Sequence, residues 1–369
     1  MWSMRADDRN TRIEDKNGFI ELLRFMLCMI IFMHHSGHVN VNRPALLPSG
    51  GLAADAFFIL TGYYAIRHIC KLHDSGNTPD KPFFYSVKYT IKKLLRVFPY
   101  AAFGTVITYI LECVIAVRTG TGLTLVDIIS KCKTLVIELF FLPLTGLMSL
   151  DLLTYRNAPM WYLSAMLFAL PIVMWLAFRL GKIFKYVLVW LIPIAIQISF
   201  LYMYGGILPW QTFLGFINTG ILRGLSSMLL GGALFYLLKA VSGKYKATES
   251  YVIPTVMEIL LYIVFLFLVI RGVTGVGEMI TLYVVSVALA FSLSGMTYTS
   301  RIRGRIISLL GRLSMPIFCI HWGIYRWVGA FFGYLDYRVA ILMVLILCLV
   351  TAYILMIIIG KLTEVSNNA

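Results

Sequence analysis

Residues 18–38, GFIELLRFMLCMIIFMHHSGH, decide the fold of this chain. The segment is mostly apolar and long enough to cross a bilayer, because about 20 helical residues span the roughly 30 Å hydrocarbon core. It also carries Glu21, Arg24, His34 and His35. Ionisable side chains are costly inside a membrane and usually face a partner or a cavity. The segment therefore predicts a membrane-spanning helix with functional polar groups.

The composition of the whole chain agrees with this first segment. Hydrophobic residues make up 60% of the 369 positions and charged residues only 13%, whereas soluble domains carry about 25% charged residues. The apolar residues come in runs of roughly 20 rather than in the alternation of a β-barrel. These features exclude a soluble globular domain and predict an all-α integral membrane protein.

The basic residues between the apolar runs predict the topology. The eleven runs begin near residues 19, 50, 97, 134, 160, 184, 215, 252, 277, 309 and 337. If residues 134–150 do not cross the membrane, 22 Lys and Arg residues lie on the cytoplasmic side and 8 on the outer side; if they cross, the division is 15 to 15. Cytoplasmic loops carry the excess of Lys and Arg, so we predict about ten transmembrane helices with both termini cytoplasmic. Residues 134–150 are then re-entrant or interfacial.

We expect one transmembrane domain over residues 1–369, with a short cytoplasmic segment at 1–17 and a short tail at 362–369. The net charge of +15 comes mainly from cytoplasmic loop residues. The lipid bilayer is therefore the expected partner, and nucleic acid is not. The six cysteines have no metal-ligand spacing, so no metal site is predicted.

Two polar residues of the first span share one helix face. Arg24 and His35 are eleven residues apart, which at 100° per residue is three turns plus about 20°, or about 16 Å along the helix. Asp55 in the second span comes to a similar depth as His35. A carboxylate beside an imidazole raises its basicity, as a general base requires. His321 lies near the middle of the ninth span.

Each of these side chains also has a structural interpretation. Arg24 could extend to the interface and pair with Glu21, and Asp55 could be an exposed acid at a helix end. A lone buried histidine such as His321 is often a hydrogen-bonded packing residue. Trp161, at an outer helix end, is typical of the aromatic belt at a membrane surface.

Five blocks in chain order resemble the signature of the acyltransferase family 3 membrane proteins. The first is the pair Arg24 and His35, separated by ten residues. The others are Gly51-Leu-Ala-Ala-Asp55-Ala-Phe-Phe-Ile-Leu-Thr-Gly62, Lys92-Lys93-Leu-Leu-Arg96-Val-Phe-Pro99, Pro159-Met-Trp161-Tyr-Leu163-Ser164 and Leu310-Gly311-Arg-Leu-Ser314-Met-Pro-Ile-Phe-Cys-Ile-His321. Two positions depart from the pattern: Thr61 stands where the family usually has Ser, and Ala165 and Met166 stand where sugar-modifying members often carry a Glu.

The resemblance implies an O-acyltransferase that moves an acyl group, commonly acetyl, from a coenzyme A thioester to a hydroxyl. The acceptor would be a cell-envelope glycan, an exopolysaccharide or a lipid-linked sugar. Acetyl-CoA or another acyl-CoA would be a co-substrate, with no cofactor held permanently. The resemblance favours a multi-pass protein of a bacterial plasma membrane, in the form without an extracellular hydrolase-like domain.

The resemblance and the polar residues together suggest specific roles. His35 is the expected catalytic base or proton relay, and Asp55 is expected to orient it. Arg24 is expected to bind the donor or organise the cytoplasmic end of the cavity. The remaining candidates for donor binding or for the cavity wall are Lys92, Lys93, Arg96, His321 and Trp161. For Lys92, Lys93 and Arg96, which lie at the cytoplasmic entry to the third span, a purely topogenic charge is the alternative.

Two competing hypotheses remain. In a transporter or flippase for a sugar or lipid intermediate, the intramembrane polar residues line a translocation path. A purely structural membrane subunit does not account for Arg24 and His35 on one helix face. Release of free coenzyme A on addition of acyl-CoA and acceptor distinguishes the enzyme from both.

Overall fold

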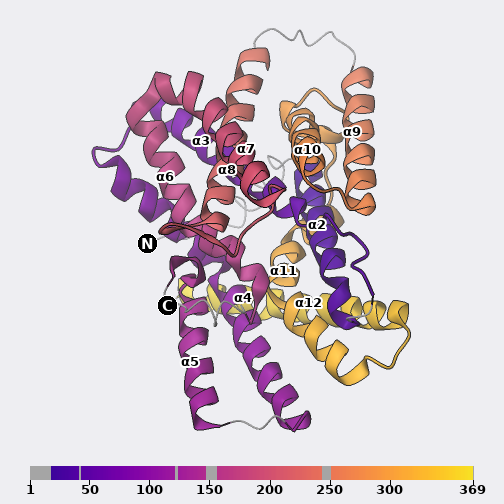
Figure 1. The fold of residues 1–369 in the computed structure, drawn as a ribbon. Coiled ribbons are helices and arrows are strands. Elements are labelled where there is room, and N and C mark those ends of the chain that lie inside the picture. Colours follow the sequence, from indigo (N-terminus) through magenta and orange to yellow (C-terminus); the bar gives the residue numbers. More distant parts are fainter. Residues whose placement is uncertain (1–17, 41–42, 121–123, 147–155, 243–250, 369) are drawn as a thin grey trace.

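The computed structural model is a bundle of helices (Figure 1). It describes residues 18–40, 43–120, 124–146, 156–242 and 251–368. The helices are α2 (Gly18–His34), α3 (Leu52–Asp74), α4 (Pro82–Arg118), α5 (Leu125–Leu139), α6 (Trp161–Ile183), α7 (Val189–Tyr204), α8 (Thr219–Ser242), α9 (Val252–Arg271), α10 (Val276–Ser294), α11 (Arg305–Phe332) and α12 (Tyr337–Asn368). A two-stranded hairpin, β1 (Phe213–Leu214) and β2 (Ile217–Asn218), joins α7 to α8.

Eight helical stretches of the described chain are long and apolar enough to cross a membrane. One of them, Ala158–Tyr204, has 47 residues, which is about 70 Å of helix and more than twice the hydrocarbon core. A kink at Gly181 (φ 39°) and a π-helical turn at Phe184–Leu188 divide it into α6 and α7. The chain is therefore a multi-pass helical membrane protein. The number of ten spans and the side of each terminus stay predictions.

Residues 134–150 were expected to form a re-entrant or interfacial segment. In the structure the first of them belong to helix α5, which begins earlier, at Leu125. Helix α5 starts at Leu125, where the side chain of Thr124 accepts a hydrogen bond from the Asp127 amide (3.2 Å) and Asp127 accepts one from the Thr124 amide (3.1 Å). This capping box stabilises a helix start. Helix α5 is not a candidate span and runs back beside α4 (Figure 1). Residues 147–150 lie outside the described residues.

The C-terminal residues also differ from the expectation. Helix α12 continues to Asn368, so most of the predicted tail at 362–369 is the end of this helix. No proline or glycine follows Gly360, and the sequence therefore contains no strong signal that would end the helix earlier.

Glycines bring the central helices close together. A Cβ atom on Gly62 of α3 would collide with the Met228 carbonyl oxygen of α8, and one on Gly231 of α8 would collide with the Ile59 carbonyl oxygen of α3. Small residues allow such close backbone approach in membrane bundles. The start of α3 is consequently fixed against α8, and this contact determines which polar side chains meet there.

We expect Gly62→Ala to lower the stability of the protein by about 1–3 kcal/mol, because an added methyl group in a tight contact forces the helices apart. The measurement is the thermal unfolding midpoint in detergent. Gly360→Ala is the control, since a Cβ atom there meets nothing within 4 Å. Equal midpoints for the two variants would contradict the close α3–α8 contact.

Candidate functional site

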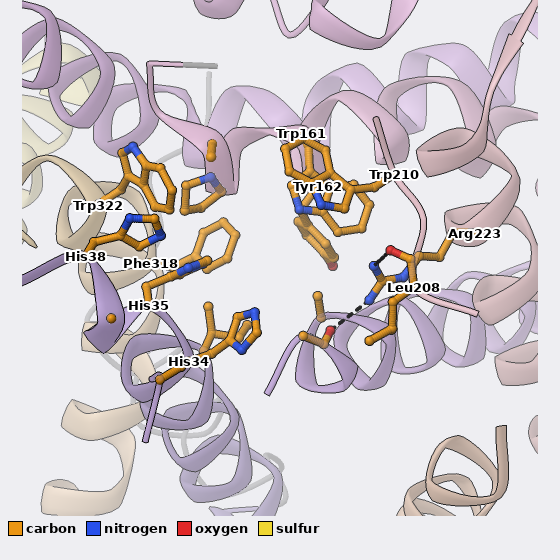
Figure 2. Close-up of a pocket in the computed structure, with 17 residues that line it drawn as sticks. His34, His35, His38, Trp161, Tyr162, Leu208, Trp210, Arg223, Phe318 and Trp322 are labelled. Atoms are coloured by element: carbon orange, nitrogen blue, oxygen red, sulfur yellow. Dashed lines mark hydrogen bonds between the residues drawn. The ribbon is translucent and has the colours of Figure 1, made fainter. Parts of the chain in front are cut away.

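A cavity of about 570 Å³ lies between the ends of α2, α3, α6 and α8 and the middle of α11, and we call it the His35 cavity (Figure 2). Its wall is mostly apolar, with several aromatic rings and a few polar groups, as ligand pockets commonly are. Two sides face each other in Figure 2: His35, His38, Phe318 and Trp322 on one, and Trp161, Tyr162, Trp210 and Arg223 on the other.

His35 begins the short 3-10 turn that follows α2. Its ring stacks on that of His321, with centroids 5.3 Å apart and planes at 25°, and meets the Trp322 ring edge-on at 5.0 Å. Among the described residues, no side chain or backbone group hydrogen-bonds to its ring nitrogens. The imidazole is therefore held by ring packing and its nitrogens can meet a ligand in the cavity.

His321 lies behind His35 rather than in the cavity wall, contrary to the expectation. Phe318 and Trp322, four residues apart on α11, occupy the face of the helix that lines the cavity. His321 instead directs Nδ1 toward the carbonyl oxygens of Phe318 (2.8 Å) and Ile317 (3.1 Å). Nδ1 must carry the proton in these contacts. The buried Nε2 is then an acceptor, and no described residue partners it.

Asp55 does not orient His35, and this expectation was wrong. Its carboxylate accepts hydrogen bonds from Arg223 Nη2 (2.5 Å), Arg223 Nε (3.0 and 3.1 Å) and the Ser227 hydroxyl (2.9 Å). The close packing of α3 on α8 explains the difference, because it turns Asp55 toward α8. Both side chains of the ion pair are buried, with 5% of Arg223 and 2% of Asp55 exposed.

Arg223 is a site residue that the sequence interpretation did not assign. Its guanidinium also donates to the carbonyl oxygens of Leu208 and Gly51, both at 2.8 Å (Figure 2). All three nitrogens thus have partners, and the group is rigid. The available signal was its position inside a span, where an arginine is rarely without a role.

Trp161 belongs to the wall of the His35 cavity. Its ring stacks on Trp210, with centroids 5.6 Å apart and planes at 22°, and the Arg223 guanidinium lies 5.0 Å from its centroid. Cation–π contact of this kind fixes the ring. Only 8% of Trp161 is exposed, which is not the environment of an interfacial belt residue.

A second cavity, of about 460 Å³, lies toward the other end of the bundle, and we call it the Arg24 cavity. Its wall is formed by the N-terminal half of α2, the middle of α3, the first half of α4, the start of α6 and one residue of α11. Three cations, Arg24, Arg67 and Lys93, line it. Arg24 also forms the ion pair with Glu21, with Nη1 3.3 Å from Oε1, so it lies in the cavity wall and is paired at the same time.

The structure separates the three basic residues of α4. Lys93 lines the Arg24 cavity together with Val97, one turn later. Lys92 and Arg96 are exposed and do not line it, so they are not part of the cavity wall, and their contact with the donor stays a prediction. Adjacent helix positions point about 100° apart, and only one member of the pair Lys92–Lys93 can face the cavity.

Two buried glutamates hold the segment that leads into α6. Glu138 accepts hydrogen bonds from the backbone amides of Arg156 (2.8 Å) and Asn157 (3.4 Å). Burial raises the pKa of the Glu138 carboxyl to about 7, against the opposing effect of these amides. Glu112 pairs with Arg326 (2.6 Å) and Arg156 (3.5 Å). These contacts position Trp161 and Tyr162 at the beginning of α6.

No cluster of His, Cys, Asp and Glu within the described ranges has the geometry of a metal site. The histidines beside the cavity are instead arranged ring against ring, with His35 and His38 centroids 5.9 Å apart. Such imidazoles can transfer protons and form hydrogen bonds.

Comparison with known proteins identifies the family. The sequence model of the acyltransferase domain family, Acyl_transf_3, matches residues 17–360. No curated protein and no solved structure matches the chain. The family match covers both cavities and all the helices that form them, so the chain belongs to acyltransferase family 3.

Proposed function

We propose that this protein transfers an acyl group, commonly acetyl, from a coenzyme A thioester to a hydroxyl of a cell-envelope glycan, an exopolysaccharide or a lipid-linked sugar. One observation carries the proposal within the assigned family: a basic cavity and a histidine-containing aromatic cavity lie at opposite halves of the bundle and share the side chain of Tyr162. This arrangement suits a reaction whose two substrates arrive from different sides.

The predicted topology gives a side of the membrane to each cavity. With ten spans and cytoplasmic termini, as the distribution of Lys and Arg favours, the first half of α2 and the last turns of α3 face the cytoplasm. The Arg24 cavity is then cytoplasmic and the His35 cavity faces the outside. The membrane would be the plasma membrane of a bacterium, where acyl-CoA is cytoplasmic and envelope glycans are external.

The cytoplasmic cavity suits the donor. Acyl-CoA carries phosphates at one end and a narrow pantetheine arm with the thioester at the other. Arg24, Arg67 and Lys93 supply the cations that such phosphates require. The deeper part of this cavity is apolar, with Leu60 and Met315 in its wall, and accommodates the acyl end.

His35 acts as the general base in this proposal. It removes the proton of the acceptor hydroxyl, whose oxygen attacks the thioester carbonyl carbon. The tetrahedral intermediate then collapses, the carbon–sulfur bond breaks, and the proton passes from His35 to the sulfur of coenzyme A. The products are the acylated acceptor and free coenzyme A. The ring of His321 packs against the His35 ring and helps to fix the position of this base.

The acceptor cavity suits a sugar. The apolar faces of a pyranose ring pack against flat aromatic rings, and Trp161 and Trp210 form a stacked pair in the wall. Asp55 contributes by fixing Arg223, which in turn holds Trp161. Its role is thus the rigidity of the aromatic wall rather than the orientation of His35.

The test uses the purified protein in liposomes with acetyl-CoA labelled in the acetyl group, and envelope polysaccharide as acceptor. We expect label in the polysaccharide and one free coenzyme A for each acetyl group transferred. Mass spectrometry of the polysaccharide from wild-type and deletion strains should show loss of an acyl-sized mass. A polymer of unchanged mass but reduced surface amount would contradict the proposal and favour a transporter.

The two neighbouring lysines of α4 give a matched prediction for donor binding. Lys93→Gln should raise the KM for acyl-CoA by about tenfold or more, because a hydrogen bond to a charged group contributes about 1.5–3 kcal/mol. Lys92→Gln, an exposed neighbour outside the cavity, should leave this KM unchanged. Equal effects of the two substitutions would show that only the overall surface charge matters.

A further inference from the structure

Tyr162 is the only side chain among the described cavity-lining residues that lines both the His35 cavity and the Arg24 cavity. It is the second residue of α6 and is 6% exposed. Trp161 and Phe318 lie beside it in the first cavity, and Thr61 and Met166 in the second. Its ring therefore stands between the histidine proposed to activate the acceptor and the cations proposed to bind the donor.

The tyrosine is held mainly by ring packing. Its ring stacks on Phe58, with centroids 4.2 Å apart and planes at 27°, and Phe318 meets it edge-on at 5.8 Å. Among the described residues, the hydroxyl has one hydrogen bond, to the Thr61 hydroxyl at 3.5 Å, which is at the long limit of such a bond. Rotation of the side chain would break one weak hydrogen bond and the ring contacts with Phe58 and Phe318, and would leave no charge unpaired.

The proposed reaction requires the donor and the acceptor to meet at the position of Tyr162. The acceptor oxygen and the thioester carbon must come to about 3–3.5 Å before they react. Donor and acceptor occupy cavities on opposite sides of the Tyr162 ring. The acyl group must therefore pass the edge of this ring, or the ring must move aside.

We propose that Tyr162 is a movable partition between the donor and acceptor cavities. Closed, it keeps water of the His35 cavity from the thioester; displaced, it allows the acyl group to reach the acceptor hydroxyl. This inference rests on the proposed function. The reaction that the partition prevents is hydrolysis, in which a water oxygen bonds to the acyl carbon, the carbon–sulfur bond breaks, and the proton ends on the sulfur of coenzyme A.

Side-chain size at position 162 is the variable for the kinetic test. Coenzyme A release is measured in proteoliposomes with acetyl-CoA, with and without the polysaccharide acceptor. Tyr162→Ala should raise the ratio of acceptor-independent hydrolysis to transfer at least tenfold. Tyr162→Phe, which keeps the ring, should retain a ratio near that of the wild type. Tyr63→Ala is the control, because Tyr63 is a buried tyrosine on α3 that lines neither cavity.

A second measurement reports on the partition without any acyl transfer. Met315→Cys places a thiol in the Arg24 cavity, and a membrane-impermeant methanethiosulfonate is added on the side of the His35 cavity. We expect little labelling when position 162 is unchanged or carries the Tyr162→Phe substitution, and at least tenfold faster labelling in the Tyr162→Ala background. The same chains without Met315→Cys give the labelling of the natural cysteines, which include the exposed Cys132.

The two measurements separate the partition from the proposed function. Faster labelling in Tyr162→Ala without acyl transfer by the wild type would keep the partition and refute the acyltransferase proposal. Labelling and hydrolysis that are the same in Tyr162→Ala as in the wild type would overturn the partition. So would equal effects of Tyr162→Phe and Tyr162→Ala, because the hydroxyl and not the ring would then be the important group.

Discussion

Replacement of His35 by alanine is expected to lower acyl transfer by about 10²- to 10⁴-fold, the usual contribution of a positioned general base. The ring lies in the cavity wall, and its nitrogens have no hydrogen-bond partner among the described residues. The substitution removes the proton acceptor and should change the stability of the fold little. The measurement is the initial rate of label transfer from acetyl-CoA to polysaccharide, with the thermal unfolding midpoint as a check on folding.

Two further histidine variants test whether the loss of acyl transfer is specific to His35. His73→Ala removes an exposed imidazole at the end of α3, away from both cavities, and should leave the rate unchanged. His321→Ala should cause a loss smaller than that of His35→Ala, since His321 acts through the stacked ring of His35. A normal rate for a folded His35→Ala protein would refute His35 as the base and leave the family assignment intact.

The sequence predicted those features of the site that depend on a single helix. The eleven-residue spacing of Arg24 and His35 places them toward the two ends of one span, and the structure has them in the walls of the two cavities. The capping box at Thr124 and Asp127 was also present in the sequence, and its pattern could have placed the start of α5 correctly.

Features that depend on contacts between helices could not be predicted in this way. Depth along a span placed Asp55 level with His35, but depth does not give the direction of a side chain around the helix axis. That direction is set by the close contact of Gly62 with Met228, which turns Asp55 toward Arg223. A single sequence, taken alone, contains no signal for a pairing between two residues that lie 168 positions apart.

The positions of Lys93 and His321 relative to the cavities also depend on how the helices pack against one another. Lys92 and Lys93 are the same residue type with the same charge. Only the orientation of α4 about its axis, relative to the neighbouring helices, brings Lys93 and not Lys92 into the wall of the Arg24 cavity. On α11, Phe318 and Trp322 lie one turn apart and occupy the cavity face, which leaves His321 on the adjacent face. The sequence placed His321 inside a span and Lys93 at the cytoplasmic entry to the third span. Which of these side chains faces a cavity depends on the packing of the helices.

The ion pair of Asp55 and Arg223 gives the second large expected effect, on stability. Asp55→Asn leaves the Arg223 guanidinium buried without a counter-charge, and loss of one partner of a buried pair costs about 3–5 kcal/mol. Arg223→Gln should cost a similar amount. The double variant Asp55→Asn/Arg223→Gln should be more stable than the sum of the two single losses predicts, because no unpaired charge remains.

The same cycle discriminates between the two roles considered for Asp55. If its carboxylate oriented His35, Asp55→Asn would lower acyl transfer at an unchanged unfolding midpoint, and the effects of the Asp55 and Arg223 substitutions would simply add. The observed geometry predicts the opposite: a lowered midpoint in each single variant, strong coupling between them, and loss of transfer that follows the displacement of Trp161. Since Trp161 is held by the Arg223 guanidinium, the double variant should regain stability before it regains acceptor binding, and the KM for the acceptor should stay raised.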